Sequence, residues 1–300
     1  MLAIVSPEGK AGFGLCVLCW LLTPIELAAQ SAAFTRALQL EHGAFRYPGL
    51  PNAVVHGRAP PDPAEPLDLV VFLHGFRGCA LAQMSSEPVA CAPARSEGRV
   101  RAPIAGRKLA RVHERASTRT LLVVPQLKLL ARDGSPGRFG RAGGFAAFVR
   151  ELLDHALVDV VGAGGFARLR RIALVAHSAG YQTALAILER GGMAERVRDV
   201  VLLDALYAGP RRFEQWLLEA PGRRLISLHA GRGKPARHSR SLARRLRRAG
   251  LVSLRFDDAL LRGERSSSPR APFRWAVAEV DTPHARFPQV HMASVLQLLF

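Results

Sequence analysis

Residues 171–188, RIALVAHSAGYQTALAIL, decide the fold of this 300-residue chain. An apolar run is followed by His177 and Ser178 between small residues, and then by alanines and leucines at helical spacing. This order nearly reproduces G-x-S-x-G, the sequence that exposes a serine hydroxyl on a sharp turn between a strand and a helix. Ala176 stands in place of the first glycine. The stretch alone therefore leaves two interpretations of Ser178, a nucleophile or the N-cap of a buried helix.

Strand and helix patterns alternate along the rest of the chain. Short apolar runs predict strands at 53–56, 67–76 (a run ending in His-Gly), 120–127, 171–176, 200–203, 223–231 and 274–281. Helical patterns lie at 105–116, 145–157, 181–192, 213–220 and 239–250, and a last one follows residue 284. Alternation of this kind predicts an α/β fold, with a doubly wound, mostly parallel sheet and helices on both faces.

Polar residues whose side chains could take part in catalysis follow the predicted strands, namely His74, Ser178, Asp204 and His284. The carboxyl ends of parallel strands form the ligand crevice of an open α/β sheet. A serine hydroxyl is a weak nucleophile until an imidazole takes its proton, and the imidazole needs a carboxylate to orient it. The order Ser, Asp, His along the chain suits this architecture. The sequence therefore predicts a catalytic triad of Ser178, Asp204 and His284.

Three pieces of sequence together resemble the α/β-hydrolase family: FLHGF (72–76), VAHSAG (175–180) and a late histidine followed by a helix. The resemblance runs from residue 67 to the end of the chain, and the Ala-x-Ser-x-Gly turn is similar to that of some bacterial lipases and esterases. It implies that Ser178 is the nucleophile. It also implies that the backbone N–H groups of Phe76 and Ala179 form an oxyanion hole, which stabilises the charge of a tetrahedral intermediate.

The resemblance implies a serine hydrolase that cleaves a carboxylic ester through an acyl-enzyme. Two alternatives stay open. One is an amidase or thioesterase acting on cell-envelope material, and the other is a non-catalytic protein of the same fold that binds an anionic surface. The expected partner is a small-molecule or lipid ester. No phosphate-binding glycine pattern and no metal-ligand cluster occurs in the sequence, so we expect chemistry without cofactor or metal.

The acid and the base each have competitors in the sequence. Asp204 ends the strand after the serine's helix, whereas Asp257 and Asp258 lie later in LRFDDALL. His284 directly follows the last strand, whereas His291 lies inside the closing segment, where side chains more often pack. Position along the chain favours Asp204 and His284.

Two further histidines have supporting roles in this interpretation. His177 is expected to line or support the pocket, because adjacent side chains diverge at the serine turn. His74 is expected to hold the oxyanion loop through hydrogen bonds.

A loop or lid insertion is predicted near 78–105 and is expected to border the substrate cleft. It contains Cys79 and Cys91, which could close it as a disulfide in an oxidising compartment. The proline- and glycine-rich loop 132–144 is expected to form another wall of the cleft.

The first 31 residues have the pattern of a secretory signal peptide. Lys10 precedes the apolar run 11–22, which is short for a membrane span and is followed by small residues. We expect residues 1–31 to be a signal peptide, with an uncleaved membrane anchor as the alternative. Residues 32–300 are then a single hydrolase domain, exported to the periplasm or beyond the cell.

The net charge is +18, and only four of the 42 basic residues are lysine. Such an arginine- and alanine-rich composition is typical of a GC-rich genome. The charge peaks in the segment 232–248, which could contact an anionic surface. That segment lacks the aromatic residues that stack on bases, which argues against nucleic acid as the partner.

No pattern in the sequence indicates the acyl chain or the leaving group of the substrate, a mobile lid, or the oligomeric state.

Overall fold

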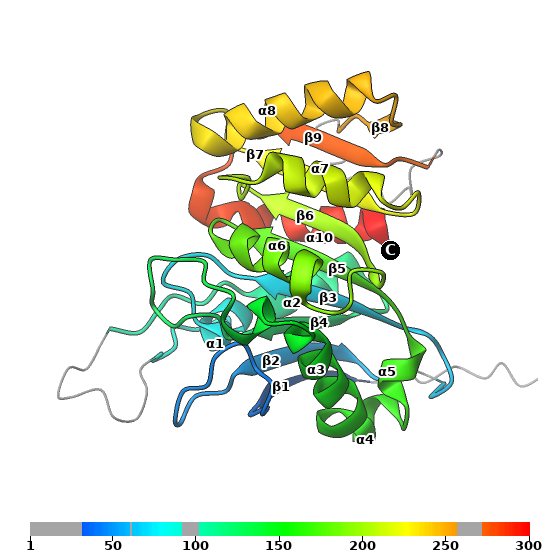
Figure 1. Ribbon diagram of the computed structural model, residues 1–300. Helices are drawn as coiled ribbons and strands as arrows, with labels where there is room; N and C mark the ends of the chain where they lie inside the picture. Colours follow the sequence, from blue (N-terminus) through cyan, green and yellow to red (C-terminus); the bar gives the residue numbers. More distant parts are fainter. Residues whose placement is uncertain (1–31, 61, 92–101, 257–271) are drawn as a thin grey trace, which may run out of the picture. The chain divides into compact units, whose positions relative to one another are not determined.

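Continuous apolar runs form the centre of the sheet. The computed structural model describes residues 32–60, 62–91, 102–256 and 272–300. Strand β3 (Leu67–Leu73) is buried along its whole length, and the second half of β5 (Leu169–His177) is buried as well. The two strands pair in parallel in the middle of a nine-stranded sheet (Figure 1). Burial on both faces explains why these strands lack polar alternation.

The strand order is β1-β2-β4-β3-β5-β6-β7-β9-β8. The remaining strands are β1 (Ala33–Leu38), β2 (Ala53–Arg58), β4 (Leu121–Pro125), β6 (Val197–Leu203), β7 (Arg224–His229), β8 (Ser253–Leu254) and β9 (Trp275–Glu279). At one edge, β2 pairs antiparallel with both β1 and β4. In the spatial order given above, every neighbouring pair from β4 across to β8 is parallel. The predicted mostly parallel, doubly wound α/β sheet is confirmed.

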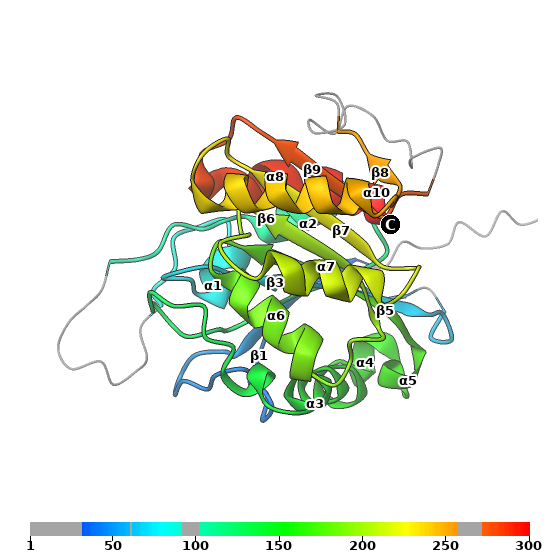
Figure 2. The same cartoon turned by 45° about the horizontal axis from the view of Figure 1, so that its top comes forward.

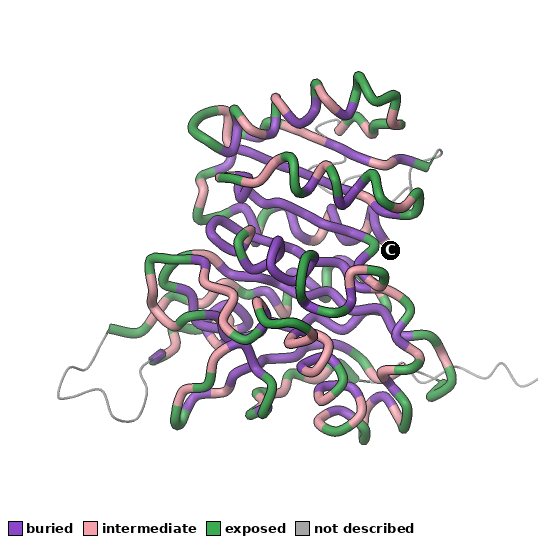
Figure 3. The backbone as a smooth tube through the Cα atoms, viewed as in Figure 1, coloured by how far each residue is buried: buried purple, intermediate pink, exposed green. Residues whose placement is uncertain are grey.

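Helices cover both faces of the sheet (Figures 1 and 2). One face packs against α3 (Gly144–Glu151), α6 (Gly180–Arg190), α7 (Pro210–Leu218) and α8 (Gly233–Arg248). The other face packs against α1 (Ala80–Met84), α2 (Leu109–Ala116) and α10 (Phe287–Leu299). The buried segments follow the strands and the inner sides of these helices (Figure 3). Residues Ser31–Phe300 form one compact unit.

Two predicted helices differ from the structure. The pattern at 145–157 forms α3, then a π-helical turn η2 (Leu152–Ala156) and a short α4 (Val158–Val161), so the helix is not continuous. The pattern at 105–116 becomes helical only at Leu109, because the preceding residue, Lys108, has a left-handed φ of 60°. A left-handed residue cannot belong to a right-handed helix.

Strand β1 was not predicted from the sequence. Its burial alternates between exposed and intermediate along AFTRAL, which is the pattern of an edge strand with one face toward solvent. The two-residue strand β8 was also missed, because two residues give no periodicity. Both strands lie at the edges of the sheet and away from its centre.

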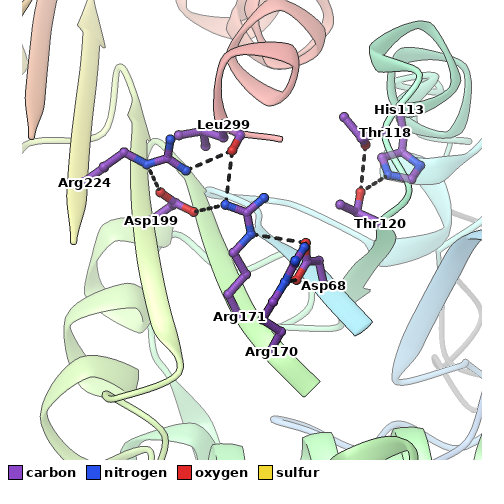
Figure 4. Close-up of polar contacts among 9 residues, drawn as sticks. All are labelled: Asp68, His113, Thr118, Thr120, Arg170, Arg171, Asp199, Arg224 and Leu299. Carbon is purple, nitrogen blue, oxygen red and sulfur yellow. Dashed lines mark hydrogen bonds and ion pairs between the residues drawn. The ribbon is translucent and has the colours of Figure 1, made fainter. Parts of the chain in front are cut away.

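An ionic network connects the C-terminal end of α10 to the amino-terminal ends of the central strands (Figure 4). Arg171 on β5 contacts the buried carboxylates of Asp68, at 3.2 Å, and Asp199, at 3.9 Å. Arg224 on β7 contacts the same Asp199 at 2.6 Å. Both guanidinium groups also donate to the carbonyl oxygen of Leu299, at 3.2 and 2.9 Å. Because α10 follows the segment of His284, this network anchors the helix at the end opposite to that histidine.

Candidate active site

Ser178 lies on a tight turn between β5 and α6. Its φ is +55°, a left-handed conformation that is uncommon for a residue with a side chain. The backbone is crowded here: a Cβ on Gly180 would lie 2.1 Å from the Leu73 carbonyl oxygen, and one on Gly75 would lie 2.6 Å from the Cβ of Ser178. Ala176, by contrast, is still inside β5, with its side chain in the core. The second glycine of the motif is thus required by space, whereas the first position accepts a methyl group.

The structure brings together the three residues predicted as a triad. The hydroxyl of Ser178 donates to Nε2 of His284 at 2.9 Å, and Nδ1 of His284 donates to the Asp204 carboxylate at 2.6 Å. The second carboxylate oxygen of Asp204 accepts the N–H of Ala230 at 3.2 Å. The residues follow β5, β6 and β9, and His284 begins the short 3₁₀ turn η3 (His284–Arg286). The serine and the aspartate are buried, and the histidine side chain is 41% exposed.

The competing candidates do not join this arrangement. His291 lies on α10, where Nε2 is 2.8 Å from the hydroxyl of Thr282 and the ring packs against Phe287. Asp257 and Asp258 lie outside the residues that the structure describes. Among the described residues, the histidine next to Ser178 Oγ is therefore His284 rather than His291.

His177 supports the segment that carries His284. Its Nε2–H donates to the carbonyl oxygen of His284 at 2.9 Å, and the two rings lie 4.8 Å apart at an angle of 30°. Burial, with a smaller contribution from the neighbouring His284, lowers the pKa of His177 to about 3. The ring is therefore neutral near neutral pH. The Arg107 guanidinium donates to the carbonyl oxygen of the next residue, Ala285, a contact that sequence reasoning missed.

The loop predicted to hold the oxyanion lies against the serine turn, as the approach of Gly75 to Ser178 shows. Neither the Phe76 N–H nor the Ala179 N–H donates to a protein acceptor among the described residues. His74 holds the loop: Nδ1–H donates to the Gly75 carbonyl at 3.0 Å, and Nε2 accepts the N–H of Leu127 at 3.2 Å. Burial lowers the pKa of His74 to about 4, so it makes these contacts as a neutral ring.

Loop 132–144 also contacts the serine turn. A Cβ on Gly134 would lie 2.1 Å from the Ala179 carbonyl oxygen, and the Gly134 carbonyl accepts the hydroxyl of Thr183 at 3.2 Å. The loop therefore lies beside the first turn of α6.

The Cys79–Cys91 disulfide is present, as predicted. Both cysteines are buried with Ala82 in a small cluster beside α1, directly after the loop of Gly75 and Phe76. The N–H of Ala80 is accepted by the side chain of Gln126 at 2.8 Å, which ties this segment to the end of β4. Within the described part of the chain, no group of three or more His, Cys, Asp or Glu residues is placed to hold a metal ion.

Two tyrosines beside the site were not singled out from the sequence. The ring of Tyr207 meets the ring of His284 edge-on, with centroids 6.3 Å apart and an angle of 89°. Tyr181 stacks with Tyr207 at 6.3 Å and 30°. Their spacing was the available signal, because Tyr181 lies three residues after Ser178 and Tyr207 three residues after Asp204.

A mostly parallel sheet with serine, aspartate and histidine after β5, β6 and β9 has the architecture of the α/β-hydrolases. A mutant of the feruloyl esterase module from Clostridium thermocellum, complexed with sinapinate, superposes with a TM-score of 0.51 and 8% identity, covering 90% of this chain and 87% of that one. A ferulic acid esterase superposes with a TM-score of 0.50 and 12% identity, covering 89% of this chain and 98% of that one. The chain thus has the α/β-hydrolase fold. No family model and no curated protein matches its sequence.

Proposed function

We propose that this protein is a serine hydrolase that cleaves carboxylic esters through an acyl-enzyme. One observation carries the proposal: a continuous chain of hydrogen bonds runs from Ser178 through His284 to Asp204. Because the Nδ1–H bond to the carboxylate fixes the tautomer of the imidazole, Nε2 has a lone pair directed at the serine proton. That arrangement turns a weak hydroxyl nucleophile into an effective one.

The reaction follows from the positions of these groups. As Ser178 Oγ attacks the ester carbonyl, its proton passes to Nε2 of His284, and the buried Asp204 carboxylate stabilises the imidazolium. The carbonyl oxygen becomes an oxyanion, for which the N–H groups of Phe76 and Ala179 are the proposed donors. The intermediate collapses when the C–O bond to the alcohol breaks and His284 returns the proton to the leaving oxygen. Water then attacks the acyl-enzyme with His284 as its base.

The test is hydrolysis of p-nitrophenyl butyrate by the wild type and by Ser178→Ala. The proposal expects kcat to fall on the order of 10⁴-fold or more, because the nucleophile is removed. Ser241→Ala on α8 is the matched control and should keep the wild-type rate. Equal rates for the wild type and Ser178→Ala would overturn the proposal.

Ester cleavage is chosen over amide or thioester cleavage because the two superposed structures bear esterase names. Rates on matched p-nitrophenyl esters, p-nitroanilides and thioesters of one acyl group test this choice. A higher kcat/KM for the anilide or thioester would assign the protein to the alternative class.

We further propose that the chain is exported. The Cys79–Cys91 disulfide supports this, because disulfides persist in oxidising compartments. The predicted signal peptide, residues 1–31, lies outside the described residues, and among the helices that are described none has the length and apolarity needed to cross a membrane. Mass spectrometry of the secreted protein should find a mature N-terminus near residue 31. Retention of the whole chain in the cytoplasm would contradict export.

Contact with an anionic surface is a second proposal, favoured by one side of α8. Lys234, Arg237, Arg240 and Arg244 line a groove of about 630 Å³ on this helix. Arg240 pairs with Glu279, while the other three make no ion pair to another described residue. Vesicles containing phosphatidylglycerol should bind the wild type in a salt-dependent manner and should bind a triple Gln variant of the three cations weakly. Arg36→Gln on β1 is the control, and equal binding by the triple variant would reject the proposal.

A further inference from the structure

The chain contains only three tyrosines; one of them, Tyr207, lies beside His284, and a second, Tyr181, stacks with Tyr207. Tyr181 is in the first turn of α6, and Tyr207 is on the loop between β6 and α7. Both residues are partly exposed, although Tyr181 also packs in part against the core. A pair of rings that packs mainly for stability would be covered by other apolar groups. These two rings leave part of their surface exposed, close to the site of the proposed reaction, where a substrate could contact it.

The loop that carries Tyr207 is held in place by two hydrogen bonds. The Tyr207 N–H donates to the carbonyl oxygen of Ala205 at 2.8 Å. Nδ1–H of His238, on α8, donates to the carbonyl oxygen of Leu206 at 3.0 Å. These two contacts hold the backbone that leads into this tyrosine, and an aromatic ring on a held backbone can select a ligand by shape.

The position of the rings indicates which half of an ester they meet. In the proposed reaction His284 returns its proton to the leaving oxygen, so the alcohol half of the ester must lie against the imidazole. Tyr207 contacts that imidazole, and Tyr181 continues the aromatic surface beyond it. On the proposed oxyanion side, the side chain of Phe76 is 54% exposed.

We propose that Tyr207 and Tyr181 bind a flat aromatic group in the alcohol half of the substrate, so that the preferred substrates are esters of aromatic alcohols. This inference rests on the proposed function and narrows its substrate class. Aromatic rings favour offset-stacked or edge-on neighbours at centroid distances of about 4.5–7 Å. The two rings are placed to offer such a contact to a benzyl group, whereas a saturated ring of similar size gains burial without it.

The experiment compares benzyl acetate with cyclohexylmethyl acetate, two esters with similar leaving alcohols that differ in aromaticity. The wild type should show a higher kcat/KM for the benzyl ester. Tyr207→Leu and Tyr181→Leu should lower this preference by about 3- to 10-fold, the range that an aromatic contact contributes. Their rates on the saturated ester should fall less than their rates on the benzyl ester, and circular dichroism should show that both variants fold. Phe34→Leu on β1 is the control for an aromatic-to-leucine change and should keep the preference.

A second pair of esters, methyl phenylacetate and methyl cyclohexylacetate, tests the acyl half. A preference for the benzyl ester that both variants keep would overturn the inference, as would an equal loss of rate on both members of the first pair. An effect confined to the acyl pair would overturn it too, because the rings would then lie on the acyl side. If the wild type hydrolysed none of the four esters, the proposed function itself would fail, which is a distinguishable result.

Discussion

At the scale of single residues, Ser178, Asp204 and His284 could be singled out as candidate site residues because each follows an apolar run that predicts a strand. The choice between His284 and His291 required the structure, because both residues lie after the last strand in the sequence. Their surroundings differ: His284 faces Ser178, whereas His291 bonds to Thr282 inside the core. The contact of Arg107 with Ala285 links segments 178 residues apart, and no sequence pattern indicates it.

The two glycine positions of the motif, 176 and 180, should differ in whether they tolerate a methyl side chain. Gly180→Ala should abolish activity and lower the free energy of unfolding, because the new Cβ would clash with the backbone carbonyl of Leu73. Ala176→Gly should keep the site and cost about 1 kcal/mol, as expected for glycine in a strand. Urea unfolding and esterase rates measure both changes. A Gly180→Ala protein with wild-type stability and activity would refute this view of the turn.

The carboxylate has a separate test in Asp204→Asn. Asparagine keeps the size of the side chain but can stabilise the tautomer of His284 that cannot take the serine proton. We expect kcat to fall on the order of 10⁴-fold with an unchanged fold, in line with the effect of this substitution in other triads. Circular dichroism controls for folding. A loss of less than 10-fold would mean that another acid orients the histidine.

At the scale of elements, the central strands and α6 were predicted because burial on both faces and clear periodicity leave strong patterns. The predictions failed where tertiary context decides. The helix at 145–157 has an apolar face throughout, yet it changes to a π-helical turn at Leu152. Strand β1 pairs with β2 through its backbone while its side chains stay partly exposed, so its sequence gives little signal.

The disulfide beside α1 is expected to stabilise this segment. Cys79→Ser/Cys91→Ser should lower the free energy of unfolding by about 3 kcal/mol, because the bond restricts the unfolded chain over a loop of 12 residues. Activity should fall as well, since the segment directly follows the predicted oxyanion loop. Urea unfolding with and without reductant measures the effect. An equally stable reduced protein would exclude a stabilising role.

At the scale of the whole molecule, three buried histidines make stability depend on pH. Burial lowers the pKa of His74 to about 4 and the pKa values of His113 and His177 to about 3. In the unfolded chain these groups titrate near pH 6.5. The unfolded state therefore binds more protons below that pH, and stability is lost as the pH falls from about 6.5 toward the folded pKa values.

The prediction is that the free energy of unfolding, measured with urea, decreases steadily between pH 6.5 and 4.5. His113→Gln removes one of the three groups and can keep a hydrogen bond to Thr120. The slope should then shrink by up to about 1.4 kcal/mol per pH unit, the value for one proton. A flat stability profile, or an unchanged slope in the variant, would show that these rings do not control acid stability.

The central claim is that Ser178 is an activated nucleophile, and peptide mapping after reaction with a fluorophosphonate tests it most directly. The triad geometry predicts one adduct per chain, located on Ser178, and no adduct in the Ser178→Ala protein. An adduct on another serine, or equal labelling of the wild type and Ser178→Ala, would contradict the account.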